Sequence, residues 1–254
     1  MFDQFSLLQL MLPISDNLEK EFADAAAMGT TADLGDLSEK LSIETVASCT
    51  FGVKAGSFET KGQTKFCEKA YGLFVHDWTD FIYMLAMQIP WLKSIMYKFH
   101  VPINKPIQYI KDTLMNMIQH KKHGMYVRND LIDFMSSALA QKEGKVGSQH
   151  FDEVAGLSGD EFLLANALAL FVAAHDTTSV FMSYLFYELA LNPDIQQKLQ
   201  NEIDEAFERE GTTGNMLEYG TMQSFNYMDM VIKETLRKYP PTGGIPRSCT
   251  KVSL

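Results

Sequence analysis

The amino-acid sequence predicts a mainly α-helical protein with one long core helix and little β-structure. Apolar residues recur at helical spacing through most of the 254-residue chain. Glycine and proline stand mainly where these apolar patterns stop, as they do at helix ends. One stretch, from about 158 to 191, contains no proline and can continue as a single helix of about 50 Å.

Several shorter helices are expected before the long one. They cover residues 16–28, 36–50, parts of 61–85, 107–123 and 129–141. Gly29, Gly52 and Gly124 stand where three of them stop, since glycine readily takes the left-handed conformation that ends a helix. The proline-rich segment 89–106 is expected to form a loop or short helices, and the polar segment 142–156 a surface loop.

The long helix has the clearest predicted start in the chain. Ser158 and Glu161 form an S-x-x-E capping box directly before an apolar run that continues to Leu191. Between 162 and 187 the only formally charged residue is Asp176, so length alone would allow the helix to span a bilayer. Polar residues near its middle, and the lack of a second comparable run in the sequence, favour a buried helix of a soluble domain instead.

Two further helices are predicted beyond the long one. Asn192 is expected to cap the first, with Pro193 at its first position, and this helix reaches about Arg209. The second covers residues 225–239 and ends before Pro240, which cannot continue a helix. The remaining segments, a loop and an extended stretch, are 211–220 and 242–252.

Charge and cysteine content exclude some classes of function. The formal net charge is −10, whereas a nucleic-acid-binding protein needs a basic face to offset phosphate charge. The three cysteines, Cys49, Cys67 and Cys249, are far apart and form no C-x-x-C pair. The sequence therefore indicates neither a disulfide framework nor a zinc site, and a reducing compartment is the default.

The centre of the long helix carries the first candidate site. Thr177 can donate its hydroxyl back to the carbonyl of Ala173, which loosens a helix locally. Asp176 places a carboxylate in an otherwise apolar wall, and burial of an unpaired charge would need compensation. The small residues Ala173 and Ala174 leave room for a flat ligand. These features suit a proton-delivery site beside a cofactor, but they fit a polar kink or a subunit contact equally well.

The second candidate site is the pair Glu234 and Arg237 on the last helix. Residues at i and i+3 share a helix face, so the two side chains can form a charge-assisted pair. An E-x-x-R pattern should arise about once by chance in a chain of this length. An exposed ion pair of little energetic weight is the simplest interpretation of the pattern alone.

These segments, taken in order, resemble the cytochrome P450 haem-thiolate monooxygenases. Residues 171–178 resemble the family's A/G-G-x-D/E-T-T/S motif, and residues 234–241 resemble its E-x-x-R helix with the following turn. The helix entry at 157–161 and the helix start at 192–196 also match in the correct order. The resemblance implies a single partial domain over residues 1–254 that forms the central part of this fold. Its character is that of the microsomal, xenobiotic-metabolising type.

The resemblance also implies a cofactor, partners and a location. The cofactor would be haem, and the electrons would come from NADPH through NADPH-cytochrome P450 reductase. The reaction would insert one oxygen atom from O2 into a lipophilic small molecule. The location would be the cytoplasmic face of the endoplasmic reticulum membrane.

Roles for individual residues follow from the same resemblance. Asp176 and Thr177 would be the catalytic residues that steer protons during oxygen activation. Ala173 and Ala174 would line the groove over the haem. Arg247 would bind a haem propionate. The structural pair would be Glu234 and Arg237, buried beneath the haem-side loops.

The sequence departs from the family pattern in three places. Ala174 occupies a position where the family has glycine, and His175 stands at a variable position, where we expect it to face a neighbouring helix. The F-x-x-G-x-x-x-C-x-G loop of the family surrounds none of Cys49, Cys67 or Cys249, so no residue of this chain is expected to be the axial metal ligand. We therefore expect a partial sequence without the amino-terminal anchor, and no oxygenation by these 254 residues alone.

Two other functions stay open at this point. One is a non-catalytic, truncated relative of the family. The other is a helical metal phosphohydrolase of the HD type, because His76, His175-Asp176 and Asp229 appear in a workable order for a divalent metal. This second alternative leaves the E-x-x-R segment unexplained.

Overall fold

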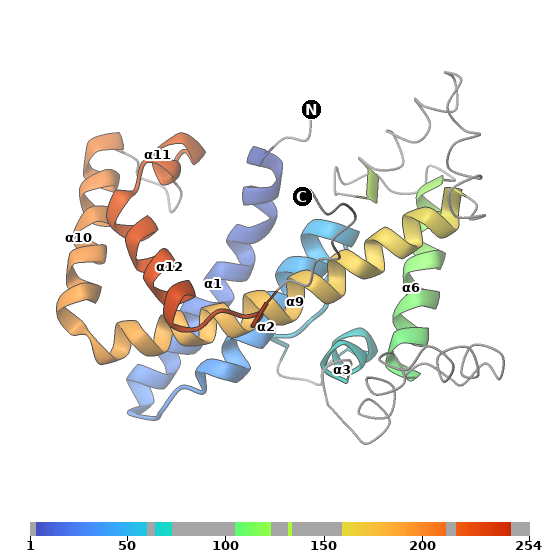
Figure 1. Cartoon of the computed structure of the whole chain (residues 1–254), viewed down its shortest axis with the longest axis horizontal. Helices are drawn as coiled ribbons and strands as arrows, with labels where there is room; N and C mark the ends of the chain where they lie inside the picture. Colours follow the sequence, from blue (N-terminus) through green and yellow to red (C-terminus); the bar gives the residue numbers. More distant parts are fainter. Residues whose placement is uncertain are drawn as a thin grey trace, which may run out of the picture. The chain divides into compact units, whose positions relative to one another are not determined.

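The computed structural model describes residues 4–59, 64–72, 105–122, 132–133, 159–211 and 217–244. Every regular element in these ranges is an α-helix (Figure 1), which confirms the predicted mainly α fold class. The helices are α1 (Gln4–Met28), α2 (Leu34–Phe51), α3 (Lys65–Tyr71), α6 (Lys105–Lys122), α9 (Gly159–Leu191), α10 (Pro193–Glu210), α11 (Tyr219–Gln223) and α12 (Asn226–Lys238).

The chain divides into two compact units, and each is described by itself. The first contains residues 1–11 and 43–173, and the second contains residues 12–42 and 174–254. Helices α1, α2 and α9 each contribute one part to the first unit and one part to the second.

The long helix α9 has 33 residues, and its bounds match the predicted 158–191. Its capping box is untested, because Ser158 lies outside the described residues. The helix was expected to be buried, and the structure buries it on one side only. One side is buried and includes Phe171 and His175, whereas Tyr184 and Tyr187 on the other side are exposed. Within the described ranges, α9 is also the one helix long and apolar enough to cross a membrane by length and composition.

Helix α1 begins earlier than its sequence pattern predicts. It starts at Gln4 rather than at residue 16 and contains Pro13 in its interior. Its end is as predicted: Gly29 has a φ of +64°, and the N–H of Thr30 donates to the carbonyl of Ala25 at 3.0 Å. Helix α2 then starts with its own cap. An Asp33 carboxylate oxygen accepts a hydrogen bond from the backbone N–H of Asp36 at 3.0 Å.

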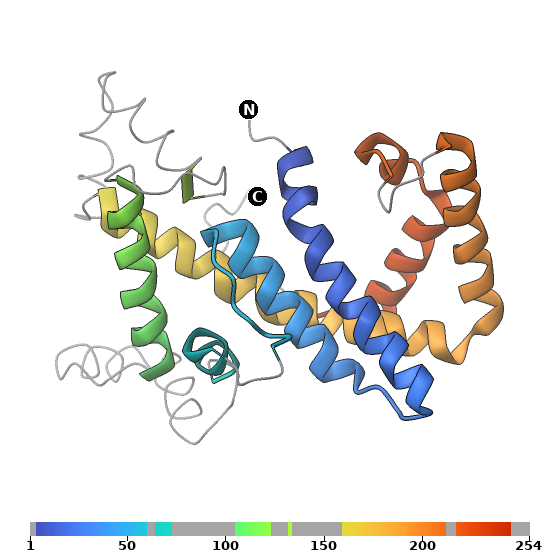
Figure 2. The ribbon, with the colours of Figure 1, turned by 180° about the vertical axis from the view of Figure 1, so that it is seen from behind.

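The core of the first unit is built around aromatic rings. Phe171 lies with its ring centroid 5.7 Å from the centroids of both Phe51 and Phe66. The same unit also buries aliphatic side chains from α6 and from the start of α9: Ile110, Leu114, Ile118, Leu163, Leu164 and Ala167. Figure 2 shows α3 beside α6 in this unit.

A buried carboxylate holds the turn that follows α2 in the same unit. Glu44 accepts hydrogen bonds from the N–H of Ala55 at 3.1 Å and from the N–H of Ser57 at 2.9 Å. The Ser57 hydroxyl donates a third bond at 2.9 Å. Gly56, between these donors, has a φ of +71°, a conformation that glycine adopts without strain. The turn is therefore fixed by one side chain from the preceding helix.

In the second unit, the later part of α1 and the first part of α2 pack on the later part of α9. The Ser42 hydroxyl donates to the backbone carbonyl of His175 at 2.6 Å, and the Ser183 hydroxyl donates to the carbonyl of Leu34 at 3.4 Å. These two pairs are eight residues apart on both helices, so α2 and α9 run antiparallel here. The ring of Phe22 on α1 also packs edge-on against the ring of Phe186 on α9, with 5.4 Å between the ring centroids.

Helices α10, α11 and α12 complete the second unit (Figure 1). They enclose a small core of Ala206, Leu217 and Phe225. Helix α11 was not predicted, since residues 211–220 were expected to form a loop throughout. Asn192 stands at the predicted cap position of α10, but its side chain makes no capping bond. Its amide instead donates to the carbonyl of Glu188 at 2.8 Å, one turn back in α9.

Several predicted segments lie mainly or wholly outside the described residues. They are most of the partly helical segment 61–85, the segment 89–106, the short helix 129–141, the loop 142–156 and the extended stretch 242–252.

Candidate functional site

The centre of α9 presents its residues to two different environments. His175 is buried, with 1% of its surface exposed, whereas Ala173 and Asp176 are exposed and Ala174 and Thr177 are half-buried. Successive residues of a helix point in directions about 100° apart. Residues next to a buried one can therefore be exposed. Asp176 and Ala173 are open to solvent while Ala174 and Thr177 lie partly covered beside them, an arrangement that a proton-delivery site next to a ligand could use.

His175 lies against a neighbouring helix, as expected. Its backbone carbonyl accepts the hydrogen bond from Ser42 of α2, and its imidazole is buried. Burial lowers the pKa of His175, because the charged imidazolium loses its hydration. The imidazole is therefore neutral at physiological pH and belongs to the packing between α2 and α9.

Asp176 is not a buried charge, which corrects the expected apolar wall. Its side chain faces solvent, so no desolvation cost has to be offset. The carboxylate instead affects a neighbour on α2. The pKa of Glu39 is raised to about 7, first by partial burial and then by the negative charges of Asp36 and Asp176. The hydrogen bond expected from Thr177 to the carbonyl of Ala173 stays a prediction.

The E-x-x-R pair forms as predicted, in bidentate geometry. Arg237 donates from Nε to one oxygen of Glu234 at 2.8 Å and from Nη2 to the other at 2.7 Å. The expected burial of the pair was wrong for this chain. The side chains are 58% exposed for Glu234 and 70% exposed for Arg237, because no described residue packs over that side of α12. The hydrogen bond lowers the pKa of Glu234 and raises that of Arg237.

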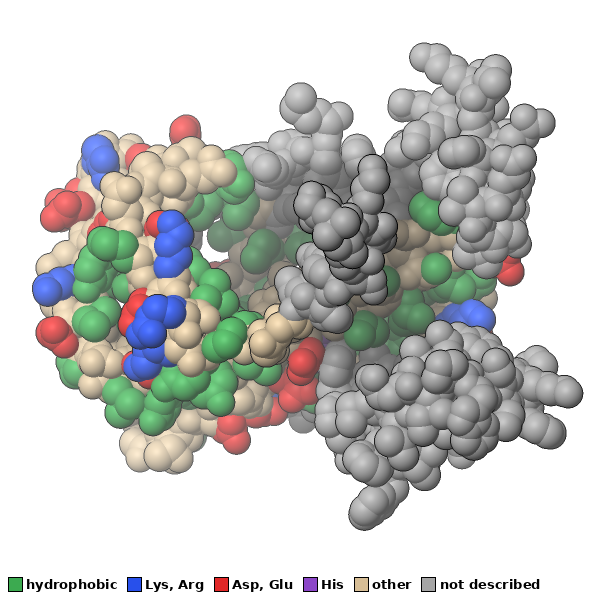
Figure 3. All heavy atoms as spheres, viewed as in Figure 1, with side chains coloured by type: hydrophobic (Ala, Val, Ile, Leu, Met, Phe, Trp, Pro, Cys, Tyr) green, Lys and Arg blue, Asp and Glu red, His purple; other side chains and the backbone are tan. Residues whose placement is uncertain are grey.

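The surface over α12 gathers basic side chains, as Figure 3 shows. They are Lys233, Arg237 and Lys238, and each is paired with a carboxylate. Lys238 reaches across to Glu188 at the end of α9, at 2.6 Å. The positive charge on this helix is therefore balanced locally.

Two acidic residues that the sequence patterns did not single out make contacts with the two ends of α12. Glu202 of α10 accepts hydrogen bonds from two backbone N–H groups at the start of α12. Glu188 of α9 accepts from Lys238 and from the hydroxyl of Tyr239 at the other end. Their partners are 25 to 51 residues away in sequence. Helical periodicity cannot predict contacts over such distances.

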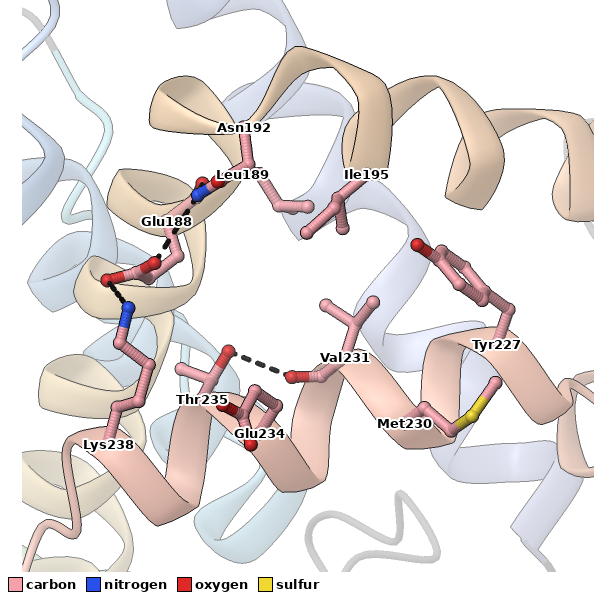
Figure 4. A pocket seen from close by; sticks show the side chains of 10 residues that line it. All are labelled: Glu188, Leu189, Asn192, Ile195, Tyr227, Met230, Val231, Glu234, Thr235 and Lys238. Carbon is pink, nitrogen blue, oxygen red and sulfur yellow. Dashed lines mark hydrogen bonds and ion pairs between the residues drawn. The ribbon is translucent and has the colours of Figure 1, made fainter.

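A small cavity lies between the end of α9, the start of α10 and the middle of α12 (Figure 4). Its volume is about 200 Å³. The walls combine apolar side chains with a polar end formed by Glu188, Asn192, Glu234 and Lys238, and the apolar lining includes Leu189, Ile195, Met230 and Val231.

The residues described in the structure offer no metal centre for the phosphohydrolase alternative. Within these ranges no three His, Cys, Asp or Glu side chains lie close enough to hold an ion. His76, the first residue proposed for that site, lies outside the described residues. Among the described residues, Cys49 and Cys67 form no disulfide, and Cys67 is buried.

The open side of α9 fits a flat cofactor. Ala173 and Ala174 carry only a methyl group each, and Ala173 and Asp176 are exposed there. Arg247, expected to bind a haem propionate, lies outside the described residues, as does Cys249.

Comparison with known proteins agrees with these features. The family model described as Cytochrome P450 matches residues 1–253. The chain is 30% identical over 239 residues to cytochrome P450 3A12 of Canis lupus familiaris. This match covers 93% of this chain and 44% of that protein. It is 28% identical over 253 residues to a probable cytochrome P450 6a14 of Drosophila melanogaster, covering 96% of this chain and 48% of that protein. The chain thus spans about half the length of the curated relatives it matches.

Proposed function

We propose that this chain, which belongs to the cytochrome P450 family, is part of a haem-dependent monooxygenase. The whole protein would insert one oxygen atom from O2 into a lipophilic small molecule, and the other atom would leave as water. One observation carries the proposal: the acid and alcohol of the family motif stand beside two alanines on α9, where Ala173 and Asp176 are exposed, Ala174 and Thr177 are half-buried, and His175 is packed.

Asp176 and Thr177 are the proposed catalytic residues. The Asp176 carboxylate faces solvent and can exchange protons with water, and the adjacent hydroxyl of Thr177 can both accept and donate a hydrogen bond. Haem, when bound, supplies the iron that activates dioxygen. The small side chains of Ala173 and Ala174 would let that flat group lie close to the helix, and Arg247 would pair with a propionate.

Glu234 and Arg237 have a structural role in this proposal. Their bidentate pair is already formed on α12, yet both side chains are more than half exposed. A planar guanidinium held by a carboxylate has further donors left for a third partner. We propose that other parts of the whole protein cover this pair and support the haem-side loops on it.

Electrons would reach the protein from NADPH through NADPH-cytochrome P450 reductase. The protein would work at the cytoplasmic face of the endoplasmic reticulum membrane, where lipophilic substrates collect. The resemblance to the microsomal type supports both the redox partner and the location.

The test is the absorption spectrum and product formation of the whole protein that contains this chain. The reduced protein with carbon monoxide should show the Soret band of a haem-thiolate centre. Asp176→Asn and Thr177→Ala should keep that band but lower oxygenation by about 100-fold, because a positioned acid or base contributes about that much. Asp194→Asn, an exposed acid on the next helix, is the control. A wild-type protein without this band would contradict the proposal.

A further inference from the structure

Helix α12, which carries the E-x-x-R pair, has no cap of its own at its start. Phe225 stands at the cap position, and its side chain cannot accept a hydrogen bond. Glu202 of α10 takes over this role: one carboxylate oxygen accepts from the N–H of Tyr227 at 2.8 Å, and the other accepts from the N–H of Met228 at 2.9 Å. A carboxylate here also complements the positive end of the helix dipole.

The other end of α12 is held by a second carboxylate. One oxygen of Glu188 on α9 accepts from the Nζ of Lys238 at 2.6 Å and from the hydroxyl of Tyr239 at 2.7 Å. Tyr239 also stacks on Tyr184 of α9, with ring centroids 4.1 Å apart and planes 2° from parallel. The two hydrogen bonds lower the pKa of Glu188 below its ordinary value, because they favour the charged carboxylate.

The middle of α12 has less to hold it. The cavity of about 200 Å³ separates the side chains of Met230 and Val231 from the corner between α9 and α10 (Figure 4). Met230 is 55% exposed. Interior packing normally fixes a helix through close contact along its length. Where that contact is interrupted, contacts at the two ends decide where the helix lies.

We propose that Glu188 and Glu202 are positioning residues for the E-x-x-R helix, because they hold α12 at both ends against α9 and α10. The expected consequence is correct placement of Glu234 and Arg237 when the haem side of the protein assembles. That consequence rests on the proposed function. Neither carboxylate touches the pair directly. Both act through the position of the helix backbone.

The first experiment measures amide hydrogen exchange in the 254-residue chain and does not depend on haem. Glu202→Ala should speed exchange in the first turns of α12 about tenfold, as expected for loss of a helix cap. Glu188→Ala should speed exchange in its last turn. Glu205→Ala, an exposed glutamate on α10, is the matched control and should leave α12 unchanged.

Conservative variants separate positioning from general stability. Glu188→Gln keeps the oxygen that accepts from Lys238 and Tyr239, and Glu202→Gln keeps one acceptor of two. Both should restore at least half of the lost protection in α12. Alanine variants with wild-type exchange in α12, or glutamine variants no better than alanine, would overturn the proposal.

The second experiment uses the whole protein at a temperature where circular dichroism shows equal folding of all variants. The alanine variants should lower the fraction of haem in the thiolate form severalfold, and the glutamine variants should recover most of it. An unchanged fraction would overturn the positioning role in assembly. A wild-type protein that binds no haem would instead remove the proposed function, while the exchange experiment would still decide whether the two carboxylates hold α12.

Discussion

Two glutamates of this chain each accept several hydrogen bonds, but their surroundings differ. Glu44 has 6% of its surface exposed and accepts three bonds from Ala55 and Ser57. Glu234 accepts two bonds from Arg237, and its side chain is 58% exposed. Water can replace a lost partner at the exposed pair but not at the buried turn. The number of hydrogen bonds therefore says less about stability than the burial of the groups that make them.

The difference separates two uses of a carboxylate. The turn held by Glu44 belongs to the packing of the first unit and should matter for folding of this chain. The exposed pair of Glu234 and Arg237 adds little to the stability of this chain. Four substitutions, taken from the largest expected effect to the smallest, test this comparison.

Glu44→Ala should be the most damaging. It leaves the N–H groups of Ala55 and Ser57 without their acceptor in a buried place, at a cost of about 3 kcal/mol. Urea unfolding followed by circular dichroism measures the loss. Glu44→Gln keeps one acceptor oxygen and should lose less. If Glu44→Ala is no more harmful than a surface substitution, the buried turn does not have the weight assigned to it.

Gly56→Ala tests the same turn from the backbone. The positive φ of +71° disfavours any side chain, and an added Cβ would approach the Thr64 Cγ2 to 2.8 Å. Together these should cost about 2 kcal/mol. Gly29→Ala is the matched control, because its φ is +64° but nothing lies within 4 Å of the added atom. Its cost should be about 1 kcal/mol, and equal costs for both variants would contradict the contact with Thr64.

Glu39→Gln tests a carboxyl of intermediate burial through pH. The pKa of Glu39 is raised from 4.5 to about 7, so the unfolded chain releases this proton at lower pH than the folded chain. The wild type should therefore lose stability relative to the variant as pH rises from about 4.5 to 7. The difference should reach about 1 kcal/mol, since partial exposure screens the charges. Glu19→Gln, exposed on α1, should follow the wild type at every pH. Parallel wild-type and Glu39→Gln curves would contradict the raised pKa.

Glu234→Gln should have the smallest effect on this chain. Because both partners are exposed, its melting temperature should change by less than about 1 °C. Scanning calorimetry of the 254-residue chain checks this. The same substitution in the whole protein should reduce haem content if the pair is covered there. A large shift in the isolated chain would remove the contrast with Glu44.

The local parts of the fold were predictable from the sequence. Helix ends at Gly29 and Gly52 follow from the backbone freedom of glycine, and the long helix from an unbroken apolar run. The E-x-x-R pair follows from spacing on one helix. Helix α1 starts at Gln4 and continues through Pro13, which the sequence pattern did not indicate, and α11 was missed because five residues carry too little pattern.

The sequence by itself determined the family, through ordered motifs, and the elements on which Asp176, Thr177, Glu234 and Arg237 lie. Burial was decided only by the tertiary structure: His175 is packed against α2, whereas Asp176 and the E-x-x-R pair are open. The roles of Glu188 and Glu202 were likewise decided there. Helical periodicity reports neighbours three or four residues away, whereas these contacts join residues that only folding brings together.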